Sequence, residues 1–388
     1  MLDNIYYIID STFAEGMKNP IFFNLTLQQK QNYLVLLDNL GVEYVELSIS
    51  SCLQEINDLI QFKKTSGLSI KLIICISDSL DDIEKTIQLQ YIDVVCVKSL
   101  LNKTNLTTDF DNSLDNSLDN SIDNSIDNSV DNSIDNLIDN LKLLKSKLPK
   151  VELQFCIPDS FDIETNFLST LYFKIDDYVD CISIEDTRGN IIHSDIEKMI
   201  SLIKSVTCSD IDIRCQFSNN NSSSVYNTFF ALQEDCKYIT TSIFGLGNEN
   251  GIADLTGIIN RIYITSPKSV YKYNLHFLKL LELYTSNTFD IPIPISNRHN
   301  LIITDHNINI SKHLDDFGLF VFNKDINVDE LKYFLYKYLP KAFNALDDKY
   351  IEKLCICIKS DILQNENLYI QLNYDQNIAI RYLLKYIN

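Results

Sequence analysis

Short apolar runs alternate with amphipathic stretches along the first two-thirds of this 388-residue chain, and this rhythm restricts the possible folds more than any other feature. The apolar runs, which are typical of buried β-strands, lie at residues 6–9, 41–50, 70–77, 92–98, 151–157, 178–189, 211–217 and 238–247. Apolar residues at helical spacing fill most of the intervals between these runs. An example is residues 26–40, which are followed by Gly41, a residue suited to a helix C-terminus. Alternating strands and helices form parallel βα units, and eight units close a barrel. The pattern predicts an α/β fold, a (β/α)8 TIM barrel over residues 1–270.

The pattern changes beyond residue 270. Pro292 and Pro294 favour extended backbone, so we expect a hinge and linker over residues 271–325. Residues 326–388 are rich in Tyr, Leu and Lys. This composition predicts a smaller, mostly helical C-terminal region.

A four-residue repeat, Asp-Asn-Ser followed by Leu, Ile or Val, interrupts the barrel pattern at residues 111–136. Apolar residues spaced by four drift around an α-helix, and Asp, Asn and Ser are poor residues for helix interiors. We therefore expect a low-complexity surface insertion, with an amphipathic helix emerging around Leu137, Leu141, Leu144 and Leu148. An expanded solvent-facing loop is the simpler interpretation, and a partner-docking role is the alternative.

Charge and cysteine usage limit the possible partners. The chain is acidic, with a formal charge of −20 and a pI near 4.6. A protein of this charge is repelled by nucleic acid and by anionic membrane surfaces, so neither is an expected partner. The sequence contains neither a signal-peptide pattern nor an apolar run of about 18 residues, so we expect a cytoplasmic protein that does not enter a membrane. The ten cysteines form no Cys-x-x-Cys pair, which favours free thiols over disulfides or zinc.

The first strand ends in a cluster of polar residues. The apolar run at 6–9 is followed at once by Asp10, Ser11 and Thr12, and then by Glu15. In a parallel barrel, the carboxyl ends of the strands carry the functional site. These side chains are therefore candidates for the barrel mouth.

Residues 10–16, Asp-Ser-Thr-Phe-Ala-Glu-Gly, resemble the opening motif of the family that contains homocitrate synthase and 2-isopropylmalate synthase. In that motif an arginine stands where this chain has Ala14. Three further stretches carry the resemblance in the same order: Glu46 within the second strand, Asp-Thr-Arg-Gly at 186–189, and Thr-Thr-Ser-Ile-Phe-Gly-Leu-Gly at 240–247. Together they cover about residues 5–260.

The resemblance implies metal-dependent barrels that join acetyl-CoA to a 2-oxo acid. Family members hold a divalent metal with a strand-one carboxylate, here Glu15, and with a His-x-His whose positions here are Gln216 and Ser218. One carboxylate and two neutral oxygens bind Mg²⁺ or Mn²⁺ poorly, so the cofactor of this chain stays open. The nearest candidate for a relocated catalytic base is His306.

The resemblance also implies a substrate pocket. Its candidate residues are Glu46, Asp186, Thr187 and Thr241. The alternative for Asp186 and Thr187 is purely structural, since such side chains often satisfy backbone groups of a loop. For Glu46 the two interpretations are about equal, because a buried carboxylate needs a partner.

Two functions remain. The first is a pseudoenzyme, a catalytically impaired homocitrate synthase-like barrel that acts as a binding or regulatory partner. Such a protein would form a homodimer, or a heterodimer with an active paralogue, and would bind a small carboxylate or an acyl-CoA. The alternative is a functioning acyltransferase with its site rebuilt around Glu15, Glu46, Gln216 and His306.

Overall fold

The computed structural model forms two compact units, residues 1–297 and 298–388. The residues that it describes are 5–18, 25–50, 52–99, 121–208, 211–294, 326, 328–364, 368 and 376–387.

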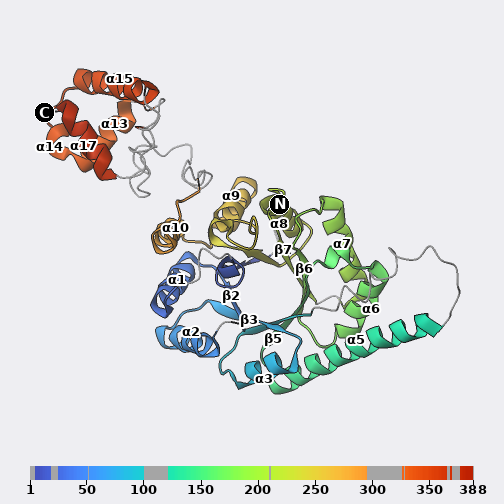
Figure 1. Ribbon diagram of the computed structural model, residues 1–388. Coiled ribbons are helices and arrows are strands. Elements are labelled where there is room, and N and C mark those ends of the chain that lie inside the picture. The colour runs from blue at the N-terminus through green and yellow to red at the C-terminus, as the bar shows by residue number, and fades with distance from the viewer. Residues whose placement is uncertain are drawn as a thin grey trace. The chain divides into compact units, whose positions relative to one another are not determined.

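Eight parallel strands in the first unit close into a barrel in the order β1 to β8, with β8 paired to β1. The strands are β1 (Tyr7–Asp10), β2 (Tyr44–Ser48), β3 (Lys71–Ser77), β4 (Val94–Lys98), β5 (Glu152–Ile157), β6 (Cys181–Asp186), β7 (Asp212–Phe217) and β8 (Tyr238–Thr241). Helices surround the strands (Figure 1). This confirms the predicted (β/α)8 barrel.

The surrounding helices follow the strands along the chain. They are α1 (Leu27–Leu40), α2 (Leu53–Ser66), α3 (Leu80–Gln88), α5 (Ser121–Lys147), α6 (Thr165–Ile175), α7 (His193–Val206), α8 (Ser224–Gln233) and α9 (Leu255–Thr265). Helix α1 begins at a capping box between Thr26 and Gln29 and ends at Gly41, whose φ of 95° suits a residue without a Cβ. The sequence predicted the glycine at the end of this helix, whereas the capping box is a finding of the structure.

The repeat segment differs from the prediction. Helix α5 already begins at Ser121, so residues 121–136 are helical rather than a loop, whereas residues 111–120 lie outside the described residues. Ile134, Leu137, Leu141 and Leu144 are buried, and α5 contacts α3 and α6. Because adding a turn to an anchored helix costs far less than nucleating one, the poor helix formers extend it.

The segment expected as hinge also differs in its first part. Helix α10 (Leu275–Phe289) packs on α1, and the Tyr284 hydroxyl donates to the backbone oxygen of Gln29 at 3.0 Å. Residues 271–289 therefore belong to the barrel unit. Pro292 and Pro294 follow in non-helical backbone, and residues 295–325 lie outside the described residues.

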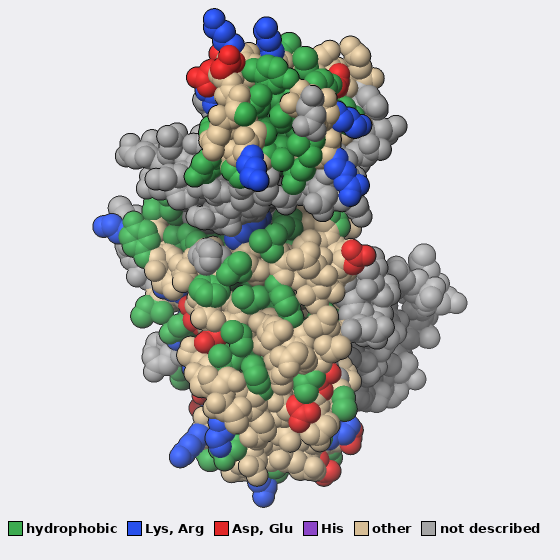
Figure 2. Space-filling model, turned by 90° about the vertical axis from the view of Figure 1, so that its left-hand side faces the viewer, with side chains coloured by type: hydrophobic (Ala, Val, Ile, Leu, Met, Phe, Trp, Pro, Cys, Tyr) green, Lys and Arg blue, Asp and Glu red, His purple; other side chains and the backbone are tan. Residues whose placement is uncertain are grey.

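The second unit is helical, as predicted. It contains α13 (Val328–Tyr338), α14 (Pro340–Phe343), α15 (Asp348–Gln364) and α17 (Gln376–Ile387). Its core includes Leu331, Leu335, Leu354, Ile358 and Leu383. Hydrophobic side chains also reach its surface (Figure 2).

Within the described ranges, no helix combines the length and the apolar composition that a membrane span requires.

Three tyrosines close the amino-terminal end of the barrel interior. The ring centres of Tyr7, Tyr44 and Tyr238 lie 5.4–5.7 Å apart in pairs. Tyr44 and Tyr238 are each 3% exposed. Aromatic pairs in tilted and edge geometries add to the free energy of area burial, so this trio fills the bottom of the barrel with side chains.

We expect Tyr44→Ala to lower the free energy of unfolding by about 3–5 kcal/mol, because the cavity it leaves is closed by strands that cannot collapse. Tyr44→Phe keeps the ring and is expected to cost less than about 1 kcal/mol. Urea unfolding of both variants measures the difference. Tyr271→Ala, at a side chain that is 77% exposed, is the matched control, and equal costs for the two Tyr44 variants would contradict the packing role.

Candidate functional site

Charged side chains project into the barrel interior at and below its carboxyl end. Arg214 on β7 contacts Glu46 on β2, and Lys98 on β4 contacts Glu185 on β6. These strands are not neighbours in the sheet. The contacts therefore cross the interior.

The first of these pairs is fully buried, since the side chains of Arg214 and Glu46 are both 0% exposed. Nη2 of Arg214 donates to Oε1 of Glu46 at 2.7 Å, and the Cys75 thiol donates to the same oxygen at 2.6 Å. The Ser11 hydroxyl donates to Oε2. Both carboxylate oxygens of Glu46 are thus already occupied.

Arg214 is equally occupied. Its Nε donates to the Thr240 hydroxyl at 2.9 Å, and its Nη1 donates to Oε1 of Gln154 at 3.2 Å. Burial alone raises the pKa of the Glu46 carboxyl, but the charges of Arg214 and Lys98 and the hydrogen bonds from Cys75 and Ser11 together outweigh burial and hold that pKa well below its usual range. Both members of the pair are therefore charged, and their hydrogen-bonding groups have partners within the barrel.

Arg214 was missed in the sequence analysis. The sequence signal that could have found it is a charged residue within the apolar strand β7. Side chains of a strand alternate between the two faces of the sheet, so such a residue can point into the barrel. Ala14, which stands at the place of the family's arginine, is 8% exposed. In this barrel the buried guanidinium belongs to Arg214 on β7.

A second group of residues, here called the mouth cluster, consists of Glu15, Lys98, Glu185 and Gln216. Nζ of Lys98 lies 3.0 Å from Oε1 of Glu185 and 3.7 Å from Oε1 of Glu15. Nζ of Lys18 lies 2.7 Å from the same oxygen of Glu15. Burial lowers the pKa of Lys98, but the charges of Glu185 and Glu46 outweigh this effect and raise it well above its usual value. Lys98 is therefore an ammonium ion at neutral pH.

The positions expected to hold a divalent metal do not fit one. Oε1 of Glu15 already contacts two ammonium groups. Gln216 is 5% exposed, and its Oε1 has no hydrogen-bond partner among the described residues. The backbone of Ser218 pairs in antiparallel orientation with the backbone of Ile252. A hard cation would meet positive charge where it needs negative charge.

Histidines do not compensate for this within the described part of the chain. The His193 ring stacks on Phe230 at 4.1 Å between ring centres, on the helical shell. His306, the candidate base, lies outside the described residues.

One further group has the composition of a metal site. Ligand atoms of Glu46, Cys75 and Cys96 lie within 4.8 Å of one another, and all three residues are buried. Arg214 already neutralises Glu46. None of the ten cysteines, all of which lie in the described ranges, forms a disulfide.

The other candidate substrate residues have polar contacts within the protein. Oδ1 of Asp186 accepts from the backbone nitrogens of Arg188 at 3.0 Å and Gly189 at 2.9 Å. The backbone N–H of Thr187 donates to Oδ1 of Asp159 at 2.8 Å, and the Thr241 hydroxyl donates to the backbone oxygen of Ile9 at 3.2 Å. Burial raises the pKa of Asp186. Their role in substrate binding stays a prediction.

Asp10 and Thr12 face the helical shell. The Tyr33 hydroxyl on α1 donates to Oδ2 of Asp10 at 3.1 Å, and the Thr12 hydroxyl does so at 3.0 Å. Thr12 in turn accepts from the backbone nitrogen of Ile243 at 3.0 Å. This network ties the end of β1 to α1 and to the loop after β8. Burial raises the pKa of Asp10 to about 7.

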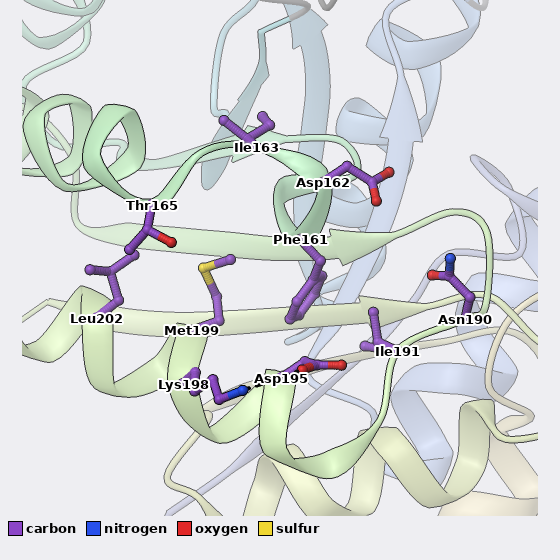
Figure 3. Close-up of a pocket in the computed structure, with 10 residues that line it drawn as sticks. All are labelled: Phe161, Asp162, Ile163, Thr165, Asn190, Ile191, Asp195, Lys198, Met199 and Leu202. Carbon is purple, nitrogen blue, oxygen red and sulfur yellow. Dashed lines mark ion pairs between the residues drawn. The ribbon is translucent and has the colours of Figure 1, made fainter. Parts of the chain in front are cut away.

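A pocket of 380 Å³ lies away from these clusters, between the loop that precedes α6 and the start of α7. Phe161 and Met199 form part of its apolar wall, and Asp162, Asp195 and Lys198 stand at its rim (Figure 3). Lys198 and Asp195 form an ion pair at 3.9 Å. None of the predicted site residues lines this pocket.

We expect Arg214→Met to lower the free energy of unfolding by about 3–5 kcal/mol, because it leaves the Glu46 carboxylate buried without its counter-charge. The double variant Arg214→Met/Glu46→Gln removes both charges and is expected to recover much of that loss. Urea unfolding of the wild type, both single variants and the double variant gives the coupling free energy. Additive single-site costs would contradict the pairing.

We expect the wild type to lose stability between about pH 4 and pH 7 through Asp10. The carboxyl ionises near pH 4 when unfolded but keeps its proton to about pH 7 when folded, so its contribution is present at low pH and lost as the pH rises. Asparagine at position 10 cannot titrate. In Asp10→Asn the free energy of unfolding is therefore expected to differ less between pH 5 and pH 8 than in the wild type, by about 2–4 kcal/mol. Urea unfolding at both pH values tests this, and parallel profiles would contradict it.

The sequence of this chain was compared with those of known proteins and families. The sequence model of the HMGL-like family matches residues 6–285. A mitochondrial homocitrate synthase of Schizosaccharomyces pombe is 26% identical over 303 residues, which cover 76% of this chain and 66% of that protein. The cytosolic homocitrate synthase isozyme of Saccharomyces cerevisiae is 26% identical over 299 residues, covering 76% and 64%. The chain thus spans slightly less than two-thirds of the length of these relatives.

Solved structures agree in fold. The hydroxymethylglutaryl-CoA lyase of Pseudomonas aeruginosa superimposes with a TM-score of 0.57 at 12% identity, covering 76% of this chain and 96% of that one. The HMG-CoA lyase of Brucella melitensis gives 0.56 at 11% identity, covering 74% and 99%. A closed eight-stranded barrel and a family match over most of its length together show that the chain belongs to the HMGL-like family and is similar to homocitrate synthases.

Proposed function

We propose that this protein is a catalytically impaired, homocitrate synthase-like barrel that acts as a binding or regulatory partner. The observation that carries the proposal is the internal neutralisation of both predicted functional carboxylates. Glu46 is paired with Arg214, and Glu15 contacts Lys18 and Lys98. Neither is available in the form that metal-dependent chemistry requires.

The chemistry of a Claisen condensation explains why this matters. Joining acetyl-CoA to a 2-oxo acid needs a cation that polarises the keto group and a base that removes a proton from the acetyl group. The loss of a general base typically costs a factor of 10² to 10⁴ in rate, and the missing electrophile adds to it. The residues at the predicted metal positions, Glu15, Gln216 and Ser218, supply one carboxylate that is already neutralised by lysines.

The same contacts bear on what the protein binds. A small carboxylate or the phosphates of an acyl-CoA would need a free cationic donor at the mouth. Each of the three guanidinium nitrogens of Arg214 already donates to a barrel side chain, and Lys98 lies between two carboxylates. We therefore favour a protein partner, namely an active paralogue that forms a heterodimer with this chain. A homodimer is the simpler assembly.

The alternative is an acyltransferase with a rebuilt site around Glu15, Glu46, Gln216 and His306. One observation supports it, because Oε1 of Gln216 is a buried acceptor without a hydrogen-bond partner among the described residues. Such an atom could accept a hydrogen bond from a bound substrate.

We expect purified protein to release no CoA thiol above background when it is incubated with acetyl-CoA and 2-oxoglutarate, 2-oxoisovalerate or pyruvate, in the presence of Mg²⁺, Mn²⁺ or Zn²⁺. A thiol reagent measures the release, and an active homocitrate synthase is the positive control. Release that depends on a 2-oxo acid would establish the acyltransferase and overturn the proposal.

The binding role has its own test. Affinity-tagged chain purified from its native cells is expected to carry a stoichiometric relative whose sequence contains an intact His-x-His. Recovery of the tagged chain alone, as a monomer in analytical ultracentrifugation, would contradict a partner role.

A further inference from the structure

The mouth cluster contains a cation that belongs to the chain itself. We propose that the Lys98 ammonium takes the place of a metal ion at the barrel mouth, and that its removal uncovers a binding site for a divalent cation formed by Glu15, Glu185 and Gln216. The inference deepens the proposed function, since it gives the reason why this barrel works without a metal.

The position of the ammonium supports the proposal. Nζ of Lys98 is 3.0 Å from Oε1 of Glu185 and 3.7 Å from Oε1 of Glu15. The two carboxylates come from different parts of the barrel, the end of β6 and the loop after β1. One cation therefore joins three strand ends, as a shared metal ion would.

The burial of the carboxylates shows why some cation is needed there. The side chain of Glu185 is 3% exposed and that of Glu15 is 10% exposed. Two carboxylates that share one cation repel each other when it is removed, and burial makes that repulsion costly. Lys18 also contacts Glu15, but its side chain is 56% exposed. An ion pair with an exposed lysine is weak, so a divalent ion can displace it.

The remaining ligand atoms suit a hard divalent ion. Gln216 is the register partner of Glu185 in the β6–β7 pair, so both side chains project from the same face of the sheet. Oε1 of Gln216 is buried and has no hydrogen-bond partner among the described residues. Two carboxylates and an amide oxygen, completed by water, form a donor set that Mn²⁺ and Mg²⁺ accept.

The wild-type chain should resist metal binding because its ammonium is covalently attached. A tethered group is present at its site at a high effective concentration, which a dissolved ion must overcome. Occupancy by Lys98 is also favoured by charge, since its ammonium lies within 4 Å of an oxygen of each carboxylate.

The test compares Lys98→Ala with the wild type, using Mn²⁺ as the probe. In EDTA, the Lys98→Ala variant is expected to melt about 2–4 °C below the wild type and to recover when Mn²⁺ is added. Calorimetry should give about one bound Mn²⁺ per chain, at least about tenfold tighter than any binding to the wild type. The melting temperature of the wild type should not respond to EDTA or Mn²⁺.

Three further variants identify the site. Lys98→Arg keeps a positive charge and should not gain Mn²⁺ binding. Lys98→Ala/Glu185→Gln removes a carboxylate ligand and should lose the recovery by Mn²⁺. Lys18→Ala, at the exposed lysine, should behave like the wild type.

The proposal is overturned if the wild type binds Mn²⁺ as tightly as Lys98→Ala, or if Lys98→Ala gains no Mn²⁺ binding. These outcomes involve no acetyl-CoA. A wild type that releases no CoA thiol, together with a Lys98→Ala variant that gains no Mn²⁺, would leave the proposed function standing and remove only this inference. A wild type that releases CoA would have the opposite effect.

Discussion

The buried ion pair between Arg214 and Glu46 is the interaction on which the barrel interior depends. An arginine placed wholly inside a barrel is tolerable only when each of its donors finds an acceptor. Here Glu46, Gln154 and Thr240 supply the acceptors from β2, β5 and β8. The pair therefore sets the chemistry of the interior: one carboxylate that could serve a ligand is consumed in holding a cation of the protein.

The mouth cluster repeats this arrangement closer to solvent. Glu15 and Glu185 are bridged by Lys98, and Lys18 adds a second ammonium beside Glu15. Both layers of acidic side chains are neutralised by the chain's own lysines and arginine. Under the function proposed above, this neutralisation keeps the mouth stable without a bound ion and leaves it without the strong Lewis acid that a condensing enzyme places against a keto group.

The fold of the barrel and the residues inside it are under different constraints. The barrel superimposes on the lyase of Pseudomonas aeruginosa with a TM-score of 0.57 at only 12% identity. A pattern of apolar strands and amphipathic helices can be met by many sequences, whereas a metal site needs particular side chains at particular strand ends. Similarity in the shell is therefore compatible with replacement of the groups inside it.

Local patterns in the sequence determined the eight strands, most of the helices and the polar ends of the strands, because apolar periodicity and glycine caps act over a few residues. They also located Glu15 and Glu46. They did not reveal that α5 starts at Ser121, since the packing of its later turns carries the repeat into the helix. Nor did they pair Arg214 with Glu46, which lie 168 positions apart. Only closure of the barrel brings such residues together, because side chains on distant strands meet across an interior that does not exist until β8 pairs with β1.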